Sequence, residues 1–226
     1  ILSRQSDPHG QTGDVRDIMI QRKSQDWEIG ISGKWNNESV KSPRLSSHKC
    51  FGEAWLGLPC SGEYLPKMKE IFKDNKSDKR NWSDVPEEEK MNKYYKPVAD
   101  VFIDELNFLR KRDKTIAANL AEYFIGRQDF YKVIGKKSQV VIEGYNFHKT
   151  LEIPYTKLPD EITDIRLLPP TKKEKQGKTI VITCNRGWQF HGRIHIKDTR
   201  VSDSESLGIE ITLEGKGKSL FTHNIY

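Results

Sequence analysis

Hydrophobic and polar residues alternate near the start of the chain in a pattern that predicts a β-hairpin. The two strands and the polar turn between them are expected at residues 13–22, 27–34 and 23–26. The hydrophobic pattern sets the register, because a shift by one residue would move every apolar side chain to the other face. We therefore pair Ile18 with Ile31. Ile20 then faces Ile29, and the four isoleucines share one face of the hairpin.

The middle of the chain carries apolar residues at helical spacing. Helices are predicted at residues 62–74, 97–112 and 115–125. The last two follow each other closely and predict a helical hairpin. Ser83 and Asp84, followed by Pro86 and three glutamates, predict a further helix N-terminus, because capping side chains and acids stabilise a first turn. Residues 35–48 are expected to form a short polar, basic element that is helical from Glu38 until Pro43 disturbs it.

From Gln139 onwards the hydrophobic period changes to two. Short strands are predicted at residues 140–142, 151–153, 162–168, 179–184, 189–197 and 207–213. The basic segment 172–178 is expected to be a flexible loop between two of them. The order of elements predicts an α/β fold with a central mixed sheet, a helical middle segment and an antiparallel, β-rich C-terminal half. We expect one compound domain, with the hairpin and helical segment in residues 1–135 and the β-rich region in residues 136–226.

The composition favours a partner that carries charge. The chain has 226 residues, of which 31% are charged, and a formal net charge of +6 with a pI of about 9.1. This length is enough for a sizeable core. The basic balance fits a polyanionic partner, although the same modest excess is found on proteins that never contact nucleic acid. Charge alone therefore does not distinguish a protein that binds nucleic acid from one that does not.

The cysteines, the apolar runs and the start of the sequence indicate the cellular compartment that we expect for the protein. Cys50, Cys60 and Cys184 are an odd number without a CxxC motif, so we expect neither a disulfide framework nor a zinc site, and a reducing cytoplasm follows as the default. No apolar run approaches 18 residues, and the start lacks the regions of a signal peptide, so a soluble protein with no membrane partner is expected. The chain opens without methionine almost on the first predicted strand, so we expect that an N-terminal segment is missing from it.

The polar face of the predicted hairpin carries the candidate chemistry. Asp17 lies opposite Ser32, and Lys34 lies diagonal to Asp17. Strands are about 4.8 Å apart and diagonal neighbours about 7 Å apart, so a carboxylate and an ammonium group can flank one divalent ion and a water molecule. Hydrolysis of a phosphodiester needs such a water and neutralisation of charge, which Mg²⁺ held by carboxylates supplies. In this arrangement Asp17 is the metal ligand and Lys34 orients the water, while Ser32 occupies the place of a second acid.

A serine is a poor magnesium ligand, so a second acid is needed elsewhere. Asp14 and Glu38 are the leading candidates, because Glu28 lies about 13 Å along the strand from Ser32. The alternative is that Asp17 and Lys34 form an ordinary cross-strand ion pair, worth well under about 1 kcal/mol. On spacing alone this alternative is the more frequent one.

Wider blocks of sequence around these residues separate the two interpretations. They are residues 13–17, 27–34, 36, 40–46, 51–60, 128–132, 187–190 and 193–195. Together they resemble the HaeIII family of type II restriction endonucleases over nearly the whole chain. The resemblance implies a PD-(D/E)xK-type nuclease with a restriction-endonuclease-like core, Mg²⁺ dependence and cleavage of double-stranded DNA within GGCC. It also implies a companion cytosine methyltransferase and a bacterial or archaeal cytoplasm. If the resemblance holds, we expect the N-terminal part of such enzymes to be missing from this chain.

A protein that reads GGCC must donate hydrogen bonds to guanine, which favours arginine or lysine. Asn36 and Lys41 are expected to contact phosphates or base edges, and Arg44 is the best candidate for reading a base. Arg186 and Arg193 belong to a basic and aromatic strip suited to contacts with the DNA backbone. For each of them, a solvated surface charge is about as frequent.

Other residues of the strip are expected to be structural. Trp188 and Phe190 are expected in the core, and His195 is expected to be a hydrogen-bonded structural residue. The segment 172–178 is either a flexible clamp on phosphates or a solvated linker.

The sequence thus predicts magnesium-dependent, sequence-specific hydrolysis of double-stranded DNA at a short palindrome. Cutting both strands calls for a symmetric homodimer or for a monomer that acts twice. Two rivals stay open: a non-catalytic, basic nucleic-acid-binding protein and a nuclease of DNA repair or recombination.

Overall fold

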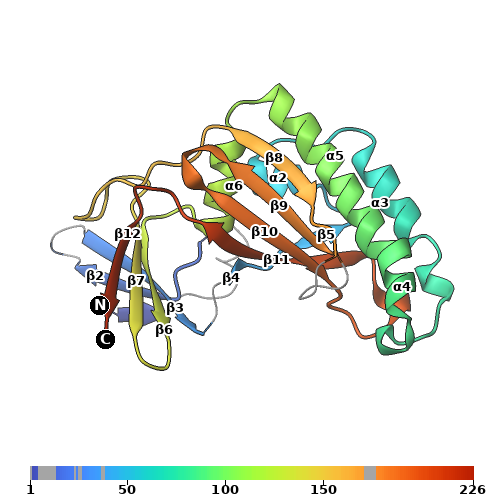
Figure 1. Ribbon diagram of the computed structural model, residues 1–226, viewed down its shortest axis with the longest axis horizontal. Coiled ribbons are helices and arrows are strands. Elements are labelled where there is room, and N and C mark those ends of the chain that lie inside the picture. The colour runs from blue at the N-terminus through green and yellow to red at the C-terminus, as the bar shows by residue number, and fades with distance from the viewer. Residues whose placement is uncertain (1, 5–13, 23, 25–26, 37–38, 171–176) are drawn as a thin grey trace.

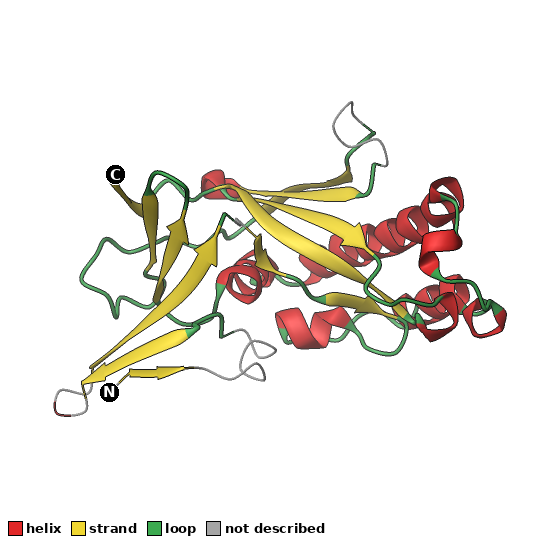
Figure 2. Ribbon diagram, turned by 90° about the horizontal axis from the view of Figure 1, so that it is seen from below, coloured by secondary structure: helices red, strands yellow, loops and turns green. Residues whose placement is uncertain are grey.

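The computed structural model contains two β-sheets and a group of helices (Figure 1). It describes residues 2–4, 14–22, 24, 27–36, 39–170 and 177–226. Viewed from below, the mixed sheet, which contains the first and last strands of the chain, lies at the end of the molecule that carries both termini. Most of the helices gather at the other end (Figure 2). A mixed sheet, an antiparallel sheet and helices are present, so the α/β class is confirmed. The restriction-endonuclease-like core stays a prediction.

Sheet A is the mixed sheet. Its strands, in spatial order, are β1 (Leu2–Arg4), β2 (Ile18–Arg22), β3 (Trp27–Trp35), β6 (Phe130–Gly135), β7 (Val140–Tyr145) and β12 (Phe221–Ile225). Strands β3 and β6 are parallel, and the other neighbours are antiparallel. The predicted hairpin is formed by β2 and β3, with Ile18 paired with Ile31 and Ile20 with Ile29. The register predicted from the hydrophobic pattern is therefore confirmed.

Sheet B is antiparallel. Its strands, in spatial order, are β4 (Ser39–Lys41), β11 (Ser206–Gly215), β10 (Gln189–His195), β9 (Thr179–Cys184) and β8 (Ile162–Leu167), and β5 (Arg44–Ser46) also pairs with β11. Strands from both parts of the chain enter each sheet: β7 and β12 join sheet A, and β4 and β5 join sheet B. The predicted boundary near residue 135 stays a prediction.

The helical elements are α2 (Phe51–Leu56), α3 (Tyr64–Phe72), α4 (Glu87–Lys90), α5 (Lys96–Arg112) and α6 (Ile116–Ile125), with a π-helical turn at Met91–Tyr95 and 3₁₀ turns at Asn75–Ser77, Trp82–Asp84, Asn185–Gly187 and Val201–Asp203. The helices α3, α5 and α6 match the three predicted helical segments closely. The consecutive helices α5 and α6 confirm the predicted helical pair. Ser83 and Asp84 do not cap a helix as expected, because they lie in a 3₁₀ turn and Pro86 precedes the first residue of α4.

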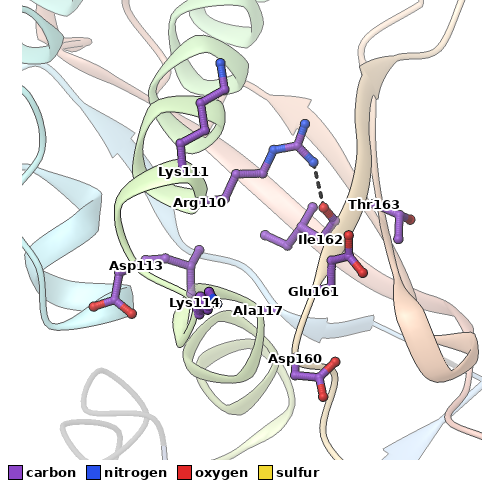
Figure 3. A pocket seen from close by; sticks show the side chains of 10 residues that line it. Arg110, Lys111, Asp113, Lys114, Ala117, Asp160, Glu161, Ile162 and Thr163 are labelled. Atoms are coloured by element: carbon purple, nitrogen blue, oxygen red, sulfur yellow. Dashed lines mark hydrogen bonds between the residues drawn. The ribbon is translucent and has the colours of Figure 1, made fainter.

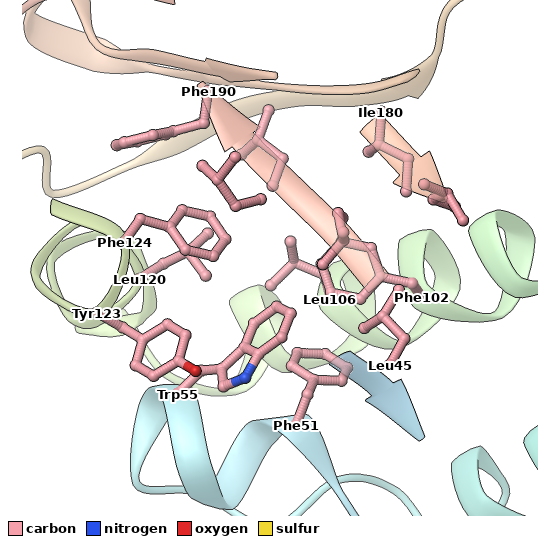
Figure 4. Close-up of a cluster of buried hydrophobic side chains, with 14 of the residues drawn as sticks. Leu45, Phe51, Trp55, Phe102, Leu106, Leu120, Tyr123, Phe124, Ile180 and Phe190 are labelled. Carbon is pink, nitrogen blue, oxygen red and sulfur yellow. The ribbon is translucent and has the colours of Figure 1, made fainter. Parts of the chain in front are cut away.

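The main core lies between sheet B and the helices (Figure 4). Trp55 of α2 stacks on Tyr123 of α6 with ring centroids 5.2 Å apart. Phe124 of α6 meets Phe190 of β10 edge-on at 5.4 Å. Trp188 and Phe190 are both fully buried, so their predicted core positions are confirmed. Contacts between aromatic rings thus join α2 to α6 and α6 to sheet B.

Two sequence-based predictions of local structure are wrong, and one strand of sheet A was missed. Residues 39–41 form strand β4 instead of a helix, because they pair with β11 at the edge of sheet B. Leu151 and Ile153 lie outside any strand, whereas β6 was not predicted. In β6 the buried positions are Phe130, Lys132 and Ile134. A lysine at a buried position breaks the apolar alternation by which such a strand is recognised.

The cysteine prediction is also wrong. Cys50 and Cys60 form a disulfide that closes the segment containing α2. Cys184 is buried, and this burial raises the pKa of its thiol to about 12. An odd cysteine count therefore arises from one local pair and one core residue. Within the described ranges, no helix is both long and apolar enough to cross a membrane.

Candidate active site

Asp17 lies just before β2 and is fixed by the neighbouring strand β3. Its backbone N–H donates to the carbonyl oxygen of Ile31 at 2.8 Å. Its carboxylate oxygen Oδ2 accepts hydrogen bonds from the Ser32 hydroxyl at 3.1 Å and from the Gly33 N–H at 2.8 Å. Ser32 is only 2% exposed, whereas Asp17 is exposed to solvent. The hairpin thus presents a carboxylate of fixed orientation at the surface of sheet A.

Lys34 shares this face of the sheet. It follows Ser32 by two residues in β3, so the alternation of side chains places both on the same side. Its side chain is half-buried. The structure therefore brings an acid, a hydroxyl and a lysine to one face, which is the arrangement on which the nuclease prediction depends.

The same face continues with two charged residues that the sequence analysis missed. Ser32 pairs in register with Lys132 of β6, and Lys132 pairs with Glu143 of β7. Lys132 is 4% exposed and Glu143 is 1% exposed. Glu143 accepts a 2.7 Å hydrogen bond from the Tyr145 hydroxyl. Buried charged residues are uncommon unless they are paired or functional. We therefore count Lys132 and Glu143 among the residues of the candidate site.

Lys216, which is exposed, forms an ion pair with the buried carboxylate of Glu143. Burial, followed by the charge of Glu143, raises the pKa of Tyr145 well above its usual value. The raised pKa keeps the Tyr145 hydroxyl protonated at neutral pH, where it donates to Glu143. The sequence signal for this part of the face is Lys132, which interrupts an otherwise apolar strand pattern.

Two acids were expected to complete a metal site, and the structure describes one of them, Asp14. Asp14 is engaged by Arg16, whose side-chain nitrogens donate to its two carboxylate oxygens at 2.9 and 2.8 Å. Arg16 also forms a 2.8 Å ion pair with Glu28. The hydrogen bonds that Arg16 donates to Asp14, and then to Glu28, raise the pKa of its guanidinium group. Glu38 lies outside the described residues.

The donor set at Asp17 suits a largely hydrated ion. Mg²⁺ usually keeps several waters and is held by one or two carboxylates together with substrate phosphates. Asp17 provides one oriented carboxylate, and Ser32 adds a hydroxyl beside it. Among the residues that the structure describes, no group of three histidines, cysteines or acids is placed to hold a metal. The residues present therefore fit a divalent ion that Asp17 would hold, with water at most of the ion's other coordination positions.

The predicted DNA contacts lie in several places. Asn36 is exposed, follows β3 directly and adopts a positive φ of 47°. Lys41 is half-buried: its ammonium lies 3.8 Å from the centre of the Tyr123 ring and donates to the Tyr123 carbonyl oxygen at 3.1 Å. Asn36 is therefore close in sequence and space to the end of the site strand, whereas Lys41 is directed towards α6.

The three arginines belong to the region of sheet B. Arg44 of β5 forms a 3.2 Å ion pair with Asp198. Arg193 of β10 pairs with Glu210 of β11 at 2.8 Å. Arg186 lies in the turn before β10, where it has a φ of 59°. All three side chains are at least 43% exposed, so their guanidinium groups are accessible to a polyanion.

The buried position of Lys41 leads to a prediction about stability. Burial, and then the nearby charge of Arg127, lower the pKa of Lys41 from 10.5 to about 8. The unfolded chain thus binds more protons than the folded protein between about pH 8 and 10.5, and stability rises with pH across that window. Replacing Lys41 by methionine should remove this rise, which is at most about 3 kcal/mol.

The measurement compares urea unfolding of the parent and the Lys41→Met variant at pH 7 and 10. Other titrating groups cancel in the comparison. Parallel stability curves for the two proteins would contradict a lowered pKa at Lys41.

A cavity of about 610 Å³ lies between the turn joining α5 to α6 and the start of β8 (Figure 3). Arg110 crosses its wall and donates to the carbonyl oxygen of Ile162 at 2.6 Å. Basic and acidic side chains both line it, and its described lining residues include none of the predicted site residues. The mixed charge of this lining gives no preference for a phosphate.

Comparisons with known proteins bear on the same site. A family model described as "HaeIII restriction endonuclease" matches residues 1–215. The chain is 34% identical to the type II restriction enzyme HaeIII of Haemophilus aegyptius, over 93% of this chain and 69% of the relative. No solved structure matches the chain. The family match includes the whole of the Asp17, Ser32 and Lys34 region.

Proposed function

This chain belongs to the HaeIII family of type II restriction endonucleases, and from that premise we propose that it cleaves double-stranded DNA within GGCC in a reaction that requires Mg²⁺. The observation that carries the proposal is the oriented carboxylate of Asp17 beside Ser32, on the face of sheet A that also carries Lys34. The similarity to a type II restriction enzyme supports the activity class, and cleavage within GGCC and the use of Mg²⁺ are parts of the proposal.

Each residue of the site has a proposed role. Asp17 binds the metal, and the hydrogen bonds from Ser32 and Gly33 hold its carboxylate in one orientation. Lys34 orients the attacking water and offsets negative charge that develops on the phosphate. When bound, Mg²⁺ neutralises phosphate charge and makes water a better nucleophile. Asp14 or Glu38 supplies a second carboxylate, and for Asp14 this requires release from Arg16.

DNA recognition is assigned to basic and amide side chains near this face and on sheet B. Asn36 contacts the scissile strand, and Arg44 reads a guanine by donating to its O6 and N7 atoms. Arg186 and Arg193 contact phosphates. Lys41 belongs to the same group, although its ammonium must leave the Tyr123 ring to reach DNA. A homodimer or a monomer acting twice cuts both strands, and a companion cytosine methyltransferase protects host DNA.

The decisive experiment is digestion of phage DNA with and without cytosine methylation of GGCC, in Mg²⁺ and in EDTA. We expect discrete fragments only from unmethylated DNA in Mg²⁺. Smeared products or equal cutting of methylated DNA would favour a repair or recombination nuclease. Binding without any cleavage would favour a non-catalytic nucleic-acid-binding protein.

A further inference from the structure

Trp35, the last residue of β3, is far more exposed than the other tryptophans. It is 70% exposed, whereas Trp27 at the start of the same strand is 38% exposed and the remaining three tryptophans are buried. An indole ring is among the largest apolar surfaces that a side chain offers, and tryptophan is enriched at binding interfaces. A partner that covered Trp35 would remove this apolar surface from water, which is favourable.

The end of β6 holds the Trp35 ring in place. Trp35 pairs in register with Gly135, and a Cβ atom added to Gly135 would lie 2.6 Å from the ring. The ring therefore lies directly over the glycine. The next residue, Asn36, donates its backbone N–H to the carbonyl oxygen of Gly135 at 3.0 Å. The ring is thus fixed before any partner arrives, so little ordering is needed on binding.

The Trp35 ring lies at the same end of sheet A as the candidate catalytic residues. Lys34 immediately precedes Trp35, and consecutive Cα atoms are about 3.8 Å apart. Their side chains leave opposite faces of the strand. Asp17 reaches this end as well, because its carboxylate accepts from the Gly33 N–H. A groove of DNA is about 6 to 12 Å wide, so a duplex with a phosphate at Lys34 extends across the strand end to Trp35.

The surroundings of the ring suit a polyanion. The turn that joins β6 to β7, residues 136–139, follows Gly135 directly (Figure 1). It is closed by the N–H of Lys136, which donates to the carbonyl oxygen of Gln139 at 2.9 Å. The turn contains two lysines and no acid, and Lys137 is exposed. An aromatic ring beside basic side chains is typical of surfaces that bind nucleic acid, so this charge favours DNA over an apolar partner.

We propose that Trp35 is a DNA anchor, whose indole ring packs on the nucleotide next to the scissile phosphate and holds the duplex against the strand end that carries Lys34. The inference rests on the proposed function and deepens it, because it adds an apolar contact to a surface assigned so far to polar contacts. The ring touches DNA before and during the reaction alike. It therefore contributes to affinity and little to the chemical step.

The first experiment measures binding of a fluorescein-labelled GGCC duplex in EDTA, and single-turnover cleavage in Mg²⁺ at saturating enzyme. For Trp35→Ala we expect affinity to fall about 10- to 100-fold, because truncating a tryptophan at an interface is among the costliest changes. Its rate at saturation should stay within about fivefold of the parent. Trp35→Phe keeps an aromatic ring and should bind within about fivefold of the parent. Gly135→Ala displaces the ring without changing its chemistry and should also weaken binding.

Trp27 provides the matched control. It lies on the same face of β3, eight residues and therefore about 26 Å from Trp35. Trp27→Phe should bind DNA as the parent does, and it leaves Trp35 as the exposed tryptophan. In this variant we expect the duplex to protect the fluorescence from acrylamide quenching. In Trp35→Phe, where Trp27 is the exposed tryptophan, the duplex should give no protection. The three buried tryptophans contribute the same background to both proteins.

Parental affinity in Trp35→Ala would overturn the inference, and so would equal acrylamide quenching of Trp27→Phe with and without DNA. Protection of Trp35 that grows with protein concentration in the absence of DNA would also overturn it, since a second copy of the chain would then cover the ring. Failure of the proposed function is distinguishable, because the parent would then bind the duplex in EDTA without cleaving it in Mg²⁺. A parent that binds no duplex would overturn both.

Discussion

Replacing Asp17 by asparagine is expected to lower the rate of DNA cleavage by about 10³-fold or more. The substitution removes the negative charge that attracts a divalent ion, and metal-assisted charge stabilisation is worth several kcal/mol, at about 1.4 kcal/mol for each tenfold in rate. The asparagine oxygen can still accept from the Ser32 hydroxyl and the Gly33 N–H, so the hairpin should keep its geometry. Single-turnover cleavage and a gel-shift assay without metal measure the two effects separately.

Glu28 provides the matched control for this substitution. It lies in the same hairpin, on β3, four residues along the strand from Ser32, and it is also exposed, but it is held in an ion pair with Arg16. Glu28→Gln should cleave within about fivefold of the parent, because an exposed ion pair contributes little. Equal losses in Asp17→Asn and Glu28→Gln would mean that general surface charge, rather than a metal ligand, is being measured.

Replacing Asp129 by asparagine is expected to lower the free energy of unfolding by about 3 kcal/mol. Asp129 is 5% exposed and immediately precedes β6. Its Oδ1 accepts from the N–H groups of Phe147 and His148, and its Oδ2 accepts from the N–H and hydroxyl of Thr150. An amide group would turn an N–H₂ towards these donors, and buried donors left without an acceptor are costly. Urea unfolding monitored by tryptophan fluorescence measures the change.

The control for Asp129 is Asp160→Asn. Asp160 also accepts side-chain hydrogen bonds, from Asn185 and Arg186, but it is exposed. Its loss should therefore cost less than about 1 kcal/mol. A similar effect of the two substitutions would show that the acceptor role of Asp129 is not what stabilises the loop against β6.

The site hairpin illustrates what can be predicted from local pattern. The alternation around Ile18 and Ile31 fixes both the pairing and the face, because a slip of one residue would expose the whole apolar set. The position of Asp17 beside Ser32 follows from that register alone. The paired helices α5 and α6 were predictable for the same reason, since their apolar residues repeat at helical spacing.

Strands whose stability depends on distant partners were not predictable in this way. Residues 39–41 are extended because β11, about 170 positions later in the chain, offers them an edge with which to pair. Strand β6 was overlooked because Lys132 occupies a buried position where the pattern calls for an apolar residue. The disulfide between Cys50 and Cys60 likewise depends on the loop that brings the two thiols together.

The sequence by itself determined the hairpin, its register and the face that carries Asp17, Ser32 and Lys34, because these depend on contacts between residues that are close along the chain. Only the tertiary structure decided that β6 lies parallel to β3 and that Lys132 and Glu143 extend the same face. Pairing of distant strands places a buried lysine beside the site, and no local pattern records which distant strand will be the neighbour.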